Sequence, residues 1–169
     1  DGTVNQLIQL VHNIHQGLDD AAEIAMIYLD ISRAFERVWH KGLLHKLFKM
    51  GVRDNILEWF RSYLSNRFQK VVYAGISSDI LELFAGLPQG ALLSPLLFLI
   101  FINDIEVDLE SDISLFADDT ALVNVFSNPV QANIILNSDL RKIELWAKRW
   151  YIDFNPSKTE YLIVSNKKS

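Results

Sequence analysis

The chain has 169 residues, of which half are hydrophobic and 22% are charged, so it is long enough for one domain and too apolar to be disordered. It contains no cysteine, which excludes disulfides, thiolate zinc sites and cysteine nucleophiles and leaves oxygen or imidazole to bind any metal. The longest apolar stretch, ALLSPLLFLIFI, is about a dozen residues long. Because a bilayer needs roughly 20, the sequence predicts no membrane-spanning segment.

Acidic and basic residues are separated along the chain. The net charge is −5, yet residues 31–70 carry nine bases and three acids, whereas residues 71–139 carry ten acids and no Lys or Arg. Carboxylates without basic partners indicate either a solvated acidic surface or a site for a hard cation such as Mg²⁺. The basic blocks at residues 31–70 and 141–168 are candidates for contact with nucleic-acid phosphates.

Hydrophobic periodicity predicts the elements of the N-terminal half. Apolar residues at three- and four-residue steps predict an amphipathic helix over residues 4–18. The run IAMIYL, residues 24–29, predicts a strand that is buried on both faces and ends at Asp30. Helices are expected over residues 40–50, closed by Gly51, and over residues 54–64. A β-hairpin is expected over residues 67–84, before the irregular loop GLPQG at residues 86–90.

The C-terminal half continues with alternating strands and helices. A buried helix is expected over residues 96–102, followed by short strands at residues 113–116 and 120–125 with Asp118 and Asp119 in the turn between them. Asn128 is expected to cap a long helix that reaches about Trp150, and the last strand is expected at residues 161–164. This order predicts an α+β fold in which a mostly antiparallel sheet is backed by helices.

Three aspartates are candidates for a metal site. If the strand that ends at Asp30 neighbours the hairpin that carries Asp118 and Asp119, the three carboxylates meet at one edge of the sheet. Asp is common in turns, so the hairpin pair alone is weak evidence. The pair is nevertheless embedded in the apolar segment SLFADDTALVNV, where its charge needs compensation. Two Mg²⁺ ions about 3.5–4 Å apart would compensate it and support in-line attack on phosphorus.

Four blocks of the sequence resemble the palm of a reverse transcriptase. They are YLDISRAFERVWH at residues 28–40, GLPQGALLSPLLFLIFINDI at 86–105, LFADDTAL at 115–122 and WAKRWYIDFNPSKTEYLIVS at 146–165. Their order and spacing are most similar to those of non-LTR (LINE-type) retrotransposons such as the jockey group. The resemblance implies an α+β polymerase palm core over residues 1–169, a partial domain whose fingers and thumb lie mostly outside the chain.

The resemblance also implies an activity and its catalytic residues. The enzyme would be an RNA-directed DNA polymerase that transfers a nucleotide from a dNTP to the 3′-hydroxyl of a DNA primer on an RNA template. Asp30 and Asp118 would bind two Mg²⁺ ions, or Mn²⁺ in their place, with Asp119 in or beside the same shell. Lys158 falls where polymerases place a lysine near the pyrophosphate, as a general acid, although a lysine in a turn is more commonly just solvated.

Four further residues are implied as nucleotide-binding. Phe35 matches the position of a sugar gate, whose ring excludes a 2′-hydroxyl; the alternative is an ordinary core phenylalanine. Gln89 matches a residue that contacts the incoming nucleotide, and Gly90 would let the backbone approach it. Ile31, directly after Asp30, completes the set.

Two positions depart from the family pattern. Glu36 stands where the family usually has Asp, and Ala91 where it usually has Ser. Neither is a metal ligand by the resemblance, but a decaying copy of an element would change in the same way. A catalytically inactive fragment that keeps the palm as a nucleic-acid-binding or assembly module therefore stays an alternative, as does another palm-type phosphotransferase such as a nucleotide cyclase. The resemblance implies an intracellular protein of nucleus or cytoplasm and indicates no oligomeric state.

Histidines and tryptophans are assigned structural roles. The pairs His12 with His15 and His40 with His45 lack carboxylate or cysteine partners at ligand spacing, so no zinc site is expected. The tryptophans are expected to pack helices rather than to stack on bases. They are Trp39, Trp59, Trp146 and Trp150.

Overall fold

The computed structural model describes residues 23–116 and 119–165, which belong to two compact units. Unit 1 holds the residues up to Ser32, Ile105–Arg149 and those from Asp153 onward; unit 2 holds Arg33–Asp104 and Trp150–Ile152. The helix expected over residues 4–18 lies outside the described residues. Within the described ranges, no helix combines the length and apolar character needed to cross a bilayer.

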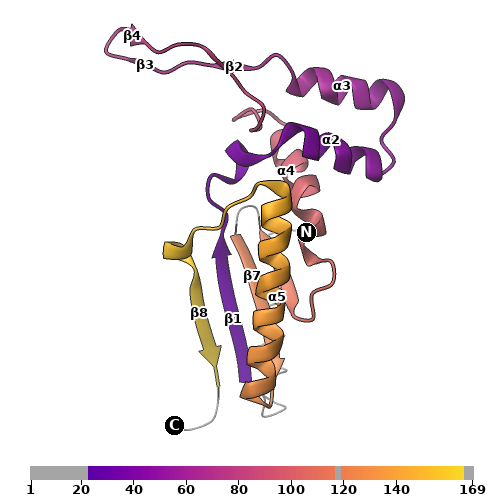
Figure 1. Ribbon diagram of the computed structural model, residues 1–169, viewed down its shortest axis with the longest axis vertical. Helices are drawn as coiled ribbons and strands as arrows, with labels where there is room; N and C mark the ends of the chain where they lie inside the picture. Colours follow the sequence, from indigo (N-terminus) through magenta and orange to yellow (C-terminus); the bar gives the residue numbers. More distant parts are fainter. Residues whose placement is uncertain (1–22, 117–118, 166–169) are drawn as a thin grey trace. The chain divides into compact units, whose positions relative to one another are not determined.

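Unit 1 is built on a four-stranded antiparallel sheet with the order β6-β7-β1-β8 (Figure 1). The strands are β1 (Glu23–Asp30), β6 (Asp112–Phe116), β7 (Asp119–Phe126) and β8 (Glu160–Val164). Each predicted strand is present within a residue or two of its expected bounds. The predicted α+β, palm-like fold with a mostly antiparallel sheet is therefore confirmed.

Helix α5 (Pro129–Trp150) covers one face of this sheet. Asn128 caps the helix as predicted, because its Oδ1 accepts hydrogen bonds from the amides of Val130 at 3.0 Å and Gln131 at 3.3 Å. Every second residue of β1, beginning with Ala25, packs against α5 in one apolar core. That core contains Ala25, Ile27, Leu29, Leu122, Ala132, Leu136 and Ile143.

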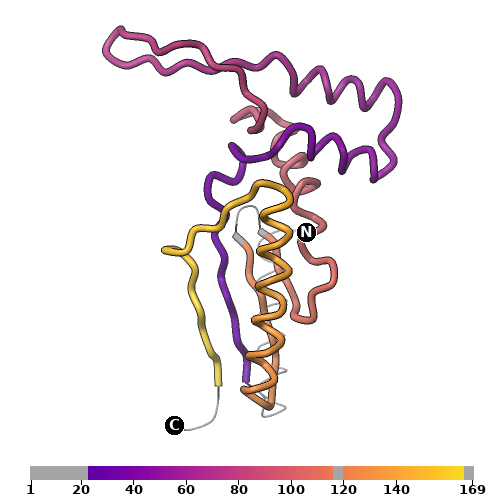
Figure 2. Tube along the Cα trace, in the orientation of Figure 1, coloured from indigo at the N-terminus to yellow at the C-terminus, as the bar shows by residue number. Residues whose placement is uncertain are grey.

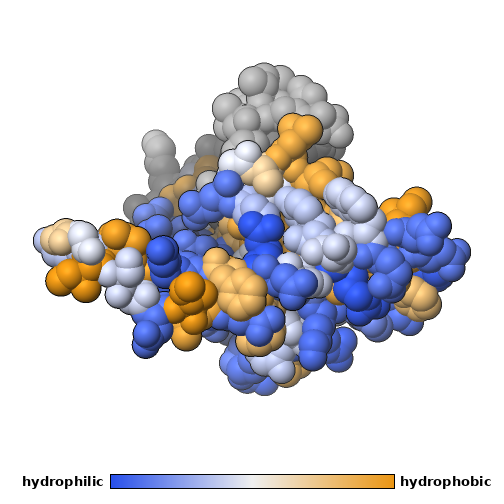
Figure 3. Space-filling model, turned by 90° about the horizontal axis from the view of Figure 1, so that it is seen from above, coloured by the Kyte–Doolittle hydropathy of each residue, from blue (hydrophilic) through white to orange (hydrophobic). Residues whose placement is uncertain are grey.

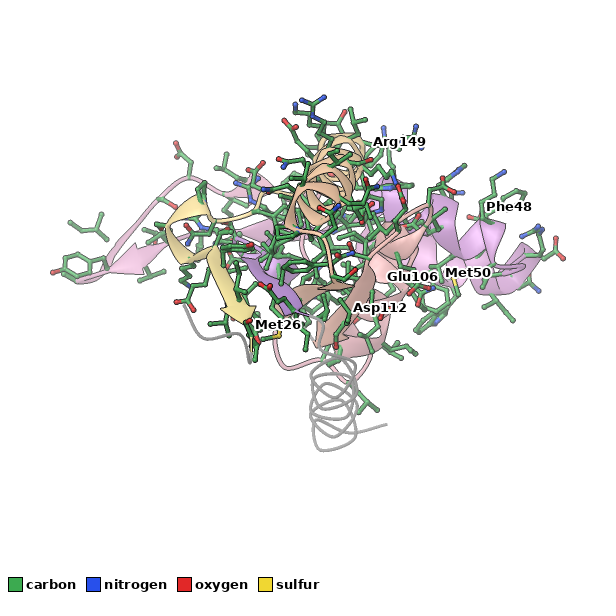
Figure 4. The ribbon with its side chains drawn as sticks, turned by 90° about the horizontal axis from the view of Figure 1, so that it is seen from below. Met26, Phe48, Met50, Glu106, Asp112 and Arg149 are labelled. Carbon is green, nitrogen blue, oxygen red and sulfur yellow. The ribbon has the colours of Figure 1, made fainter. Side chains whose placement is uncertain are left out.

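The other residues of β1 are buried as well. Ile24 and Met26 form a second apolar cluster with Val123, and Figure 4 shows Met26 projecting from β1 on the side away from α5. Side chains alternate between the two faces of a strand, so a strand buried on both faces needs a continuous apolar run. The sequence of β1 meets that requirement, as predicted.

A buried carboxylate ties α5 to the loop before β6. Asp139 is fully buried and accepts hydrogen bonds from the backbone amides of Glu110 at 3.1 Å and Ser111 at 2.8 Å. Lys142, one turn further along α5, donates to Asp139 Oδ1 at 3.1 Å. The buried charge is thus fully partnered, as a buried carboxylate must be.

Unit 2 is mainly helical. It contains the 3₁₀ helix η1 (Ala34–Arg37), α2 (His40–Lys49), α3 (Asp54–Leu64) and α4 (Ser94–Ile102). The second short 3₁₀ helix, η2 (Asn103–Glu106), follows α4 across the boundary between the units. All the helices predicted for this part of the chain are present, but α4 is buried on one side only, since Leu96 is 54% and Leu99 48% exposed.

Lys46 is a buried cation inside unit 2. Its Nζ lies 2.5 Å from Asp104 Oδ1 and 3.8 Å from the ring centroid of Trp150. Burial lowers the pKa of Lys46 to about 8, against the opposing effect of Asp104. The ion pair joins α2 to η2, directly after α4.

The predicted hairpin is present with shorter strands than expected. It pairs β2 (Phe68–Gln69) with β5 (Leu81–Glu82) and β3 (Val72–Tyr73) with β4 (Ile76–Ser77), and Figure 2 traces the chain out from α3 and back. The register shifts by one residue between the two pairs, which is the signature of a β-bulge. Its apolar side chains are exposed, and they form the orange patches at the left of Figure 3.

Candidate functional site

The carboxylate edge of unit 1 is set by the pairing of β1 with β7. Asp30 is the last residue of β1 and Asp119 the first of β7, and the two are direct Cα partners in the antiparallel register. Asp118 lies outside the described residues. In the part of the chain that the structure describes, no three acidic or histidine side chains gather as a metal site. The three-aspartate site therefore stays a prediction, while the strand pairing that it requires is present.

Lys158 lies at this edge although 128 positions separate it from Asp30. Its Nζ donates to Asp30 Oδ1 at 3.2 Å, and the lysine side chain is 64% exposed against 21% for the aspartate. An ion pair this exposed contributes little to stability, so the lysine can exchange partners readily.

Asn155 holds Lys158 in place. Its backbone amide donates to the Asp30 carbonyl at 2.8 Å, and its side-chain Oδ1 accepts from the amide of Ser157 at 3.2 Å. These bonds fix the 3₁₀ turn η3 (Pro156–Lys158) beside the end of β1. Asn155 was not among the residues predicted from the sequence, although an Asn before Pro is a recognised turn signal.

Ile31 directly follows Asp30 at the same edge of the sheet. It is buried, and its backbone pairs with Phe154, while the amide of Ser32 donates to the Asp153 carbonyl at 2.8 Å. These bonds extend the attachment of the β1 end to the segment that carries Lys158. The predicted role of Ile31 in nucleotide binding stays a prediction.

The donors at this edge suit a hard cation. Aspartate oxygens are the ligands that Mg²⁺ prefers, and the backbone positions of Asp30 and Asp119 are directly opposed in the strand pairing. The ammonium group of Lys158 places a positive charge next to Asp30. Carboxylates for a cation and an ammonium for an anion are a combination suited to the chemistry of phosphate esters.

In unit 2, the loop at residues 86–90 is hydrogen-bonded to η1 and to the residue that follows it. The amide of Gly86 donates to the Val38 carbonyl at 2.9 Å, and the amide of Leu87 donates to the Phe35 carbonyl at 2.8 Å. The backbone around Phe35 and the GLPQG loop therefore form one hydrogen-bonded assembly.

His40 adds a side-chain bond to this assembly. Its Nε2 lies 2.7 Å from the Gly86 carbonyl and the imidazole is buried. Because a carbonyl only accepts, Nε2 must carry a proton and donate it. Burial lowers the pKa of His40 below its ordinary value; the hydrogen bond to Gly86 opposes this shift, and the nearby Arg67 charge adds to it. From the sequence, His40 was considered only as a zinc ligand, and its bond to a residue 46 positions away was not predicted.

The predicted nucleotide-binding residues of unit 2 differ in exposure. Phe35 is half-buried and stacks on Phe98 of α4, with ring centroids 4.8 Å apart. This contact fits a core phenylalanine and leaves the sugar-gate role a prediction. Gln89 and Gly90 are exposed, and Gly90 has a φ of 77°, a conformation that favours glycine.

The tryptophans contact other rings or the core, as expected for packing residues. Trp39 lies edge-on to Tyr151 at 5.1 Å, and Trp59 stacks on Tyr63 at 5.5 Å. Trp146 packs against the core of unit 1, and Trp150 covers Lys46.

Gly86→Ala is expected to destabilise unit 2 by about 2 kcal/mol, because the position combines strain and a clash. Gly86 has a φ of +95°, and an added Cβ would lie 3.1 Å from the Glu36 carbonyl oxygen. The matched control is Gly75→Ala at φ +79°, where nothing lies within 4 Å, so only strain of about 1 kcal/mol is expected. Chemical denaturation of both variants measures the difference; equal losses would show that the loop yields to the methyl group.

The chain is similar in sequence to known proteins. A family model described as reverse transcriptase (RNA-dependent DNA polymerase) matches residues 4–168. The chain is 32% identical over 174 residues to the RNA-directed DNA polymerase from mobile element jockey of Drosophila melanogaster, a match that covers 98% of this chain and 19% of that protein. It is also 32% identical over 171 residues to the probable RNA-directed DNA polymerase from transposon BS of the same species, with 93% and 18% covered. The chain thus spans about a fifth of the length of these curated relatives.

Among solved structures, the chain is similar to apo telomerase from Candida tropicalis truncated from its C-terminal domain. The TM-score is 0.68 at 16% identity, and the match covers 100% of this chain and 37% of that one. At this identity the likeness is one of fold alone.

Proposed function

The chain belongs to the reverse transcriptase (RNA-dependent DNA polymerase) family, and on this premise we propose that it is the palm core of an active RNA-directed DNA polymerase. The predicted kinship with jockey-like, non-LTR retrotransposon polymerases is confirmed. The observation that carries the proposal is the register of β1 on β7, which sets Asp30 directly opposite Asp119. That the chain is a partial palm, with fingers and thumb mostly outside residues 1–169, is part of the same proposal.

The proposed reaction is nucleotidyl transfer. The primer 3′-oxygen attacks the α-phosphorus of a dNTP, the new phosphodiester bond forms, and the bond to pyrophosphate breaks. Asp30 and Asp118, with Asp119, would hold two Mg²⁺ ions, or Mn²⁺, which when bound lower the pKa of the hydroxyl and neutralise the triphosphate. Lys158 would give a proton to the leaving pyrophosphate, a role supported by the contact of its Nζ with Asp30 Oδ1 at 3.2 Å.

Unit 2 supplies the proposed nucleotide contacts. Gln89 and Gly90 would contact the incoming dNTP, and Phe35 would exclude a 2′-hydroxyl. A nucleotide-binding role for Ile31, a buried residue of unit 1, stays a prediction. Support comes from the exposure of Gln89 and Gly90 and from the bond of His40 that fixes the loop on which they lie.

The test is Mg²⁺-dependent extension of a DNA primer on an RNA template by the polypeptide that carries this chain. Asp118→Ala is expected to abolish extension, because it removes a ligand of the proposed metal pair. The matched control is Asp79→Ala, an exposed aspartate in the hairpin, which should extend like the parent.

Equal extension by Asp118→Ala and the parent would overturn the assignment of the site. RNA binding without extension, and without binding of Mg²⁺ or Mn²⁺ in calorimetry, would instead favour the inactive, nucleic-acid-binding fragment.

A further inference from the structure

Lys158 and Asp30 are brought together by the pairing of β8 with β1. Strand β8 begins at Glu160, whose register partner is Tyr28, so the turn before β8 lies beside the end of β1 (Figure 1). That turn is η3, which carries Lys158, and the lysine Nζ donates to Asp30 Oδ1 at 3.2 Å. The ion pair is therefore a consequence of the strand register.

The backbone of Lys158 is fixed to the same strand end through Asn155. The amide of Asn155 donates to the Asp30 carbonyl at 2.8 Å, and the Asn155 carbonyl accepts from the amide of Lys158 at 3.1 Å. Asn155 Oδ1 also accepts from the hydroxyl of Ser157 at 2.6 Å. These bonds involve no atom of the lysine side chain, so the backbone of the turn can stay in place when the ammonium group moves.

The lysine side chain can leave Asp30 at little cost. It is 64% exposed, and ion pairs with this much exposure contribute little to the free energy of unfolding. Asp30 differs, because its side chain is only 21% exposed and a carboxylate of low exposure favours a cationic partner. The aspartate therefore favours a bound cation, but that cation need not be Lys158.

A divalent ion is the second cation that suits Asp30. The carboxylate is a proposed ligand of two Mg²⁺ ions, which bind carboxylate oxygens at about 2.0–2.1 Å. An ammonium group 3.2 Å from Oδ1 and a dication on the same carboxylate are close enough to repel each other. Binding of one cation to Asp30 therefore weakens binding of the other.

We propose that Lys158 competes with Mg²⁺ for Asp30, so that its ammonium group is released toward phosphate oxygens when the carboxylate binds metal. The inference rests on the proposed function and adds a regulatory contact to the same site. Because coupling between two ligands is reciprocal, the contact that holds Lys158 on Asp30 opposes metal binding to the same extent. The pair would thus delay phosphate binding by Lys158 until the site is loaded.

Calorimetric titration with Mg²⁺ of the polypeptide that carries this chain tests the competition. Lys158→Met removes the charge with little change in side-chain size, and it is expected to bind Mg²⁺ about twofold to fivefold more tightly than the parent, the range for loss of an exposed ion pair. Lys158→Arg keeps the charge and should bind Mg²⁺ like the parent. The matched control is Lys148→Met, which removes an exposed lysine paired with Glu144 of α5 and should leave the affinity unchanged.

Asn155→Ala separates the position of the ammonium group from its charge. The variant keeps Lys158 and loses the Oδ1 acceptor of the turn, so an Mg²⁺ affinity between those of the parent and Lys158→Met is expected. Thermal unfolding shows whether each variant is folded. Primer extension gives a second readout. Lys158→Met should reach its half-maximal rate at a lower Mg²⁺ concentration than the parent, while its maximal rate falls because the proposed proton donor is lost.

An Mg²⁺ affinity of folded Lys158→Met that equals or falls below that of the parent would overturn the inference. If the parent nevertheless extends primers, the polymerase assignment stands and only the competition fails. If Lys158→Met gains affinity while the parent does not extend, the competition stands without the catalytic assignment. If Asp30→Asn binds Mg²⁺ like the parent, the competition and the place of Asp30 in the proposed site fail together.

Discussion

Asp30→Asn is expected to lower the turnover number for primer extension by about 10³-fold or more. A carboxylate that holds catalytic metal ions contributes several kcal/mol of charge stabilisation in the transition state, and 4 kcal/mol corresponds to a factor of about 10³. Asparagine keeps the size of the side chain and an oxygen that can accept from Lys158, so the bond seen at 3.2 Å has a substitute. The change therefore removes a negative charge with little disturbance of the fold.

Two measurements isolate the effect of that charge. Calorimetry should show weaker Mg²⁺ binding by Asp30→Asn, and thermal unfolding should show a midpoint close to that of the parent. Asp112→Asn is the control, because Asp112 is an exposed aspartate of the same sheet that begins β6 and pairs with Val123, away from the Asp30 edge. A variant that binds Mg²⁺ and extends primers like the parent would remove Asp30 from the proposed site.

Asp139→Ala is expected to cost about 3 kcal/mol of the free energy of unfolding. The substitution leaves the amides of Glu110 and Ser111 without their acceptor and removes the partner of Lys142. Buried donors that lose an acceptor cost roughly 1–3 kcal/mol each, and more when the acceptor is charged. Urea denaturation measures the loss. Asp139→Asn keeps an acceptor oxygen and should lose clearly less, so equal losses would show that the charge, rather than the hydrogen bonds, dominates.

The same carboxylate makes stability depend on pH. Burial alone would raise the pKa of Asp139, but the amides of Glu110 and Ser111 and the Lys142 ammonium lower it below its ordinary value of 3.8. Its stabilising contribution is thus complete above that value and is lost as the pH falls through the lower folded-state pKa. In acid titrations followed by circular dichroism, the parent should lose this part of its stability below about pH 4, whereas Asp139→Asn should not.

Local patterns were sufficient to predict most elements. The apolar run of β1, the Asn-Pro start of α5 and the glycine after α2 each have a physical cause within a few residues of the chain, and each predicted boundary lies close to the observed one. The partial exposure of helix α4 could not be predicted from local patterns. A segment that is apolar at every position has no period, so the sequence could not show that Leu96 and Leu99 lie on an exposed side.

Contacts between distant residues could not be predicted in this way. The bond from His40 to Gly86 and the support of Lys158 by Asn155 depend on how the chain returns to the same place, which no local pattern encodes. The resemblance to a family named Lys158 as a candidate residue, and only the structure shows its contact with Asp30. The division of the chain into two units likewise follows from tertiary contacts, whereas composition indicated one core.

The strand order of unit 1 has a consequence for biosynthesis. Both sheet neighbours of β1, namely β7 and β8, lie beyond Asp119 in the chain. After β1 has left the ribosome, its continuous apolar side chains therefore stay without a hydrogen-bonding neighbour strand while residues 31–118 are translated. Such late pairing leaves an aggregation-prone apolar segment exposed on the nascent polypeptide. Segments of this kind are the ones that chaperones protect.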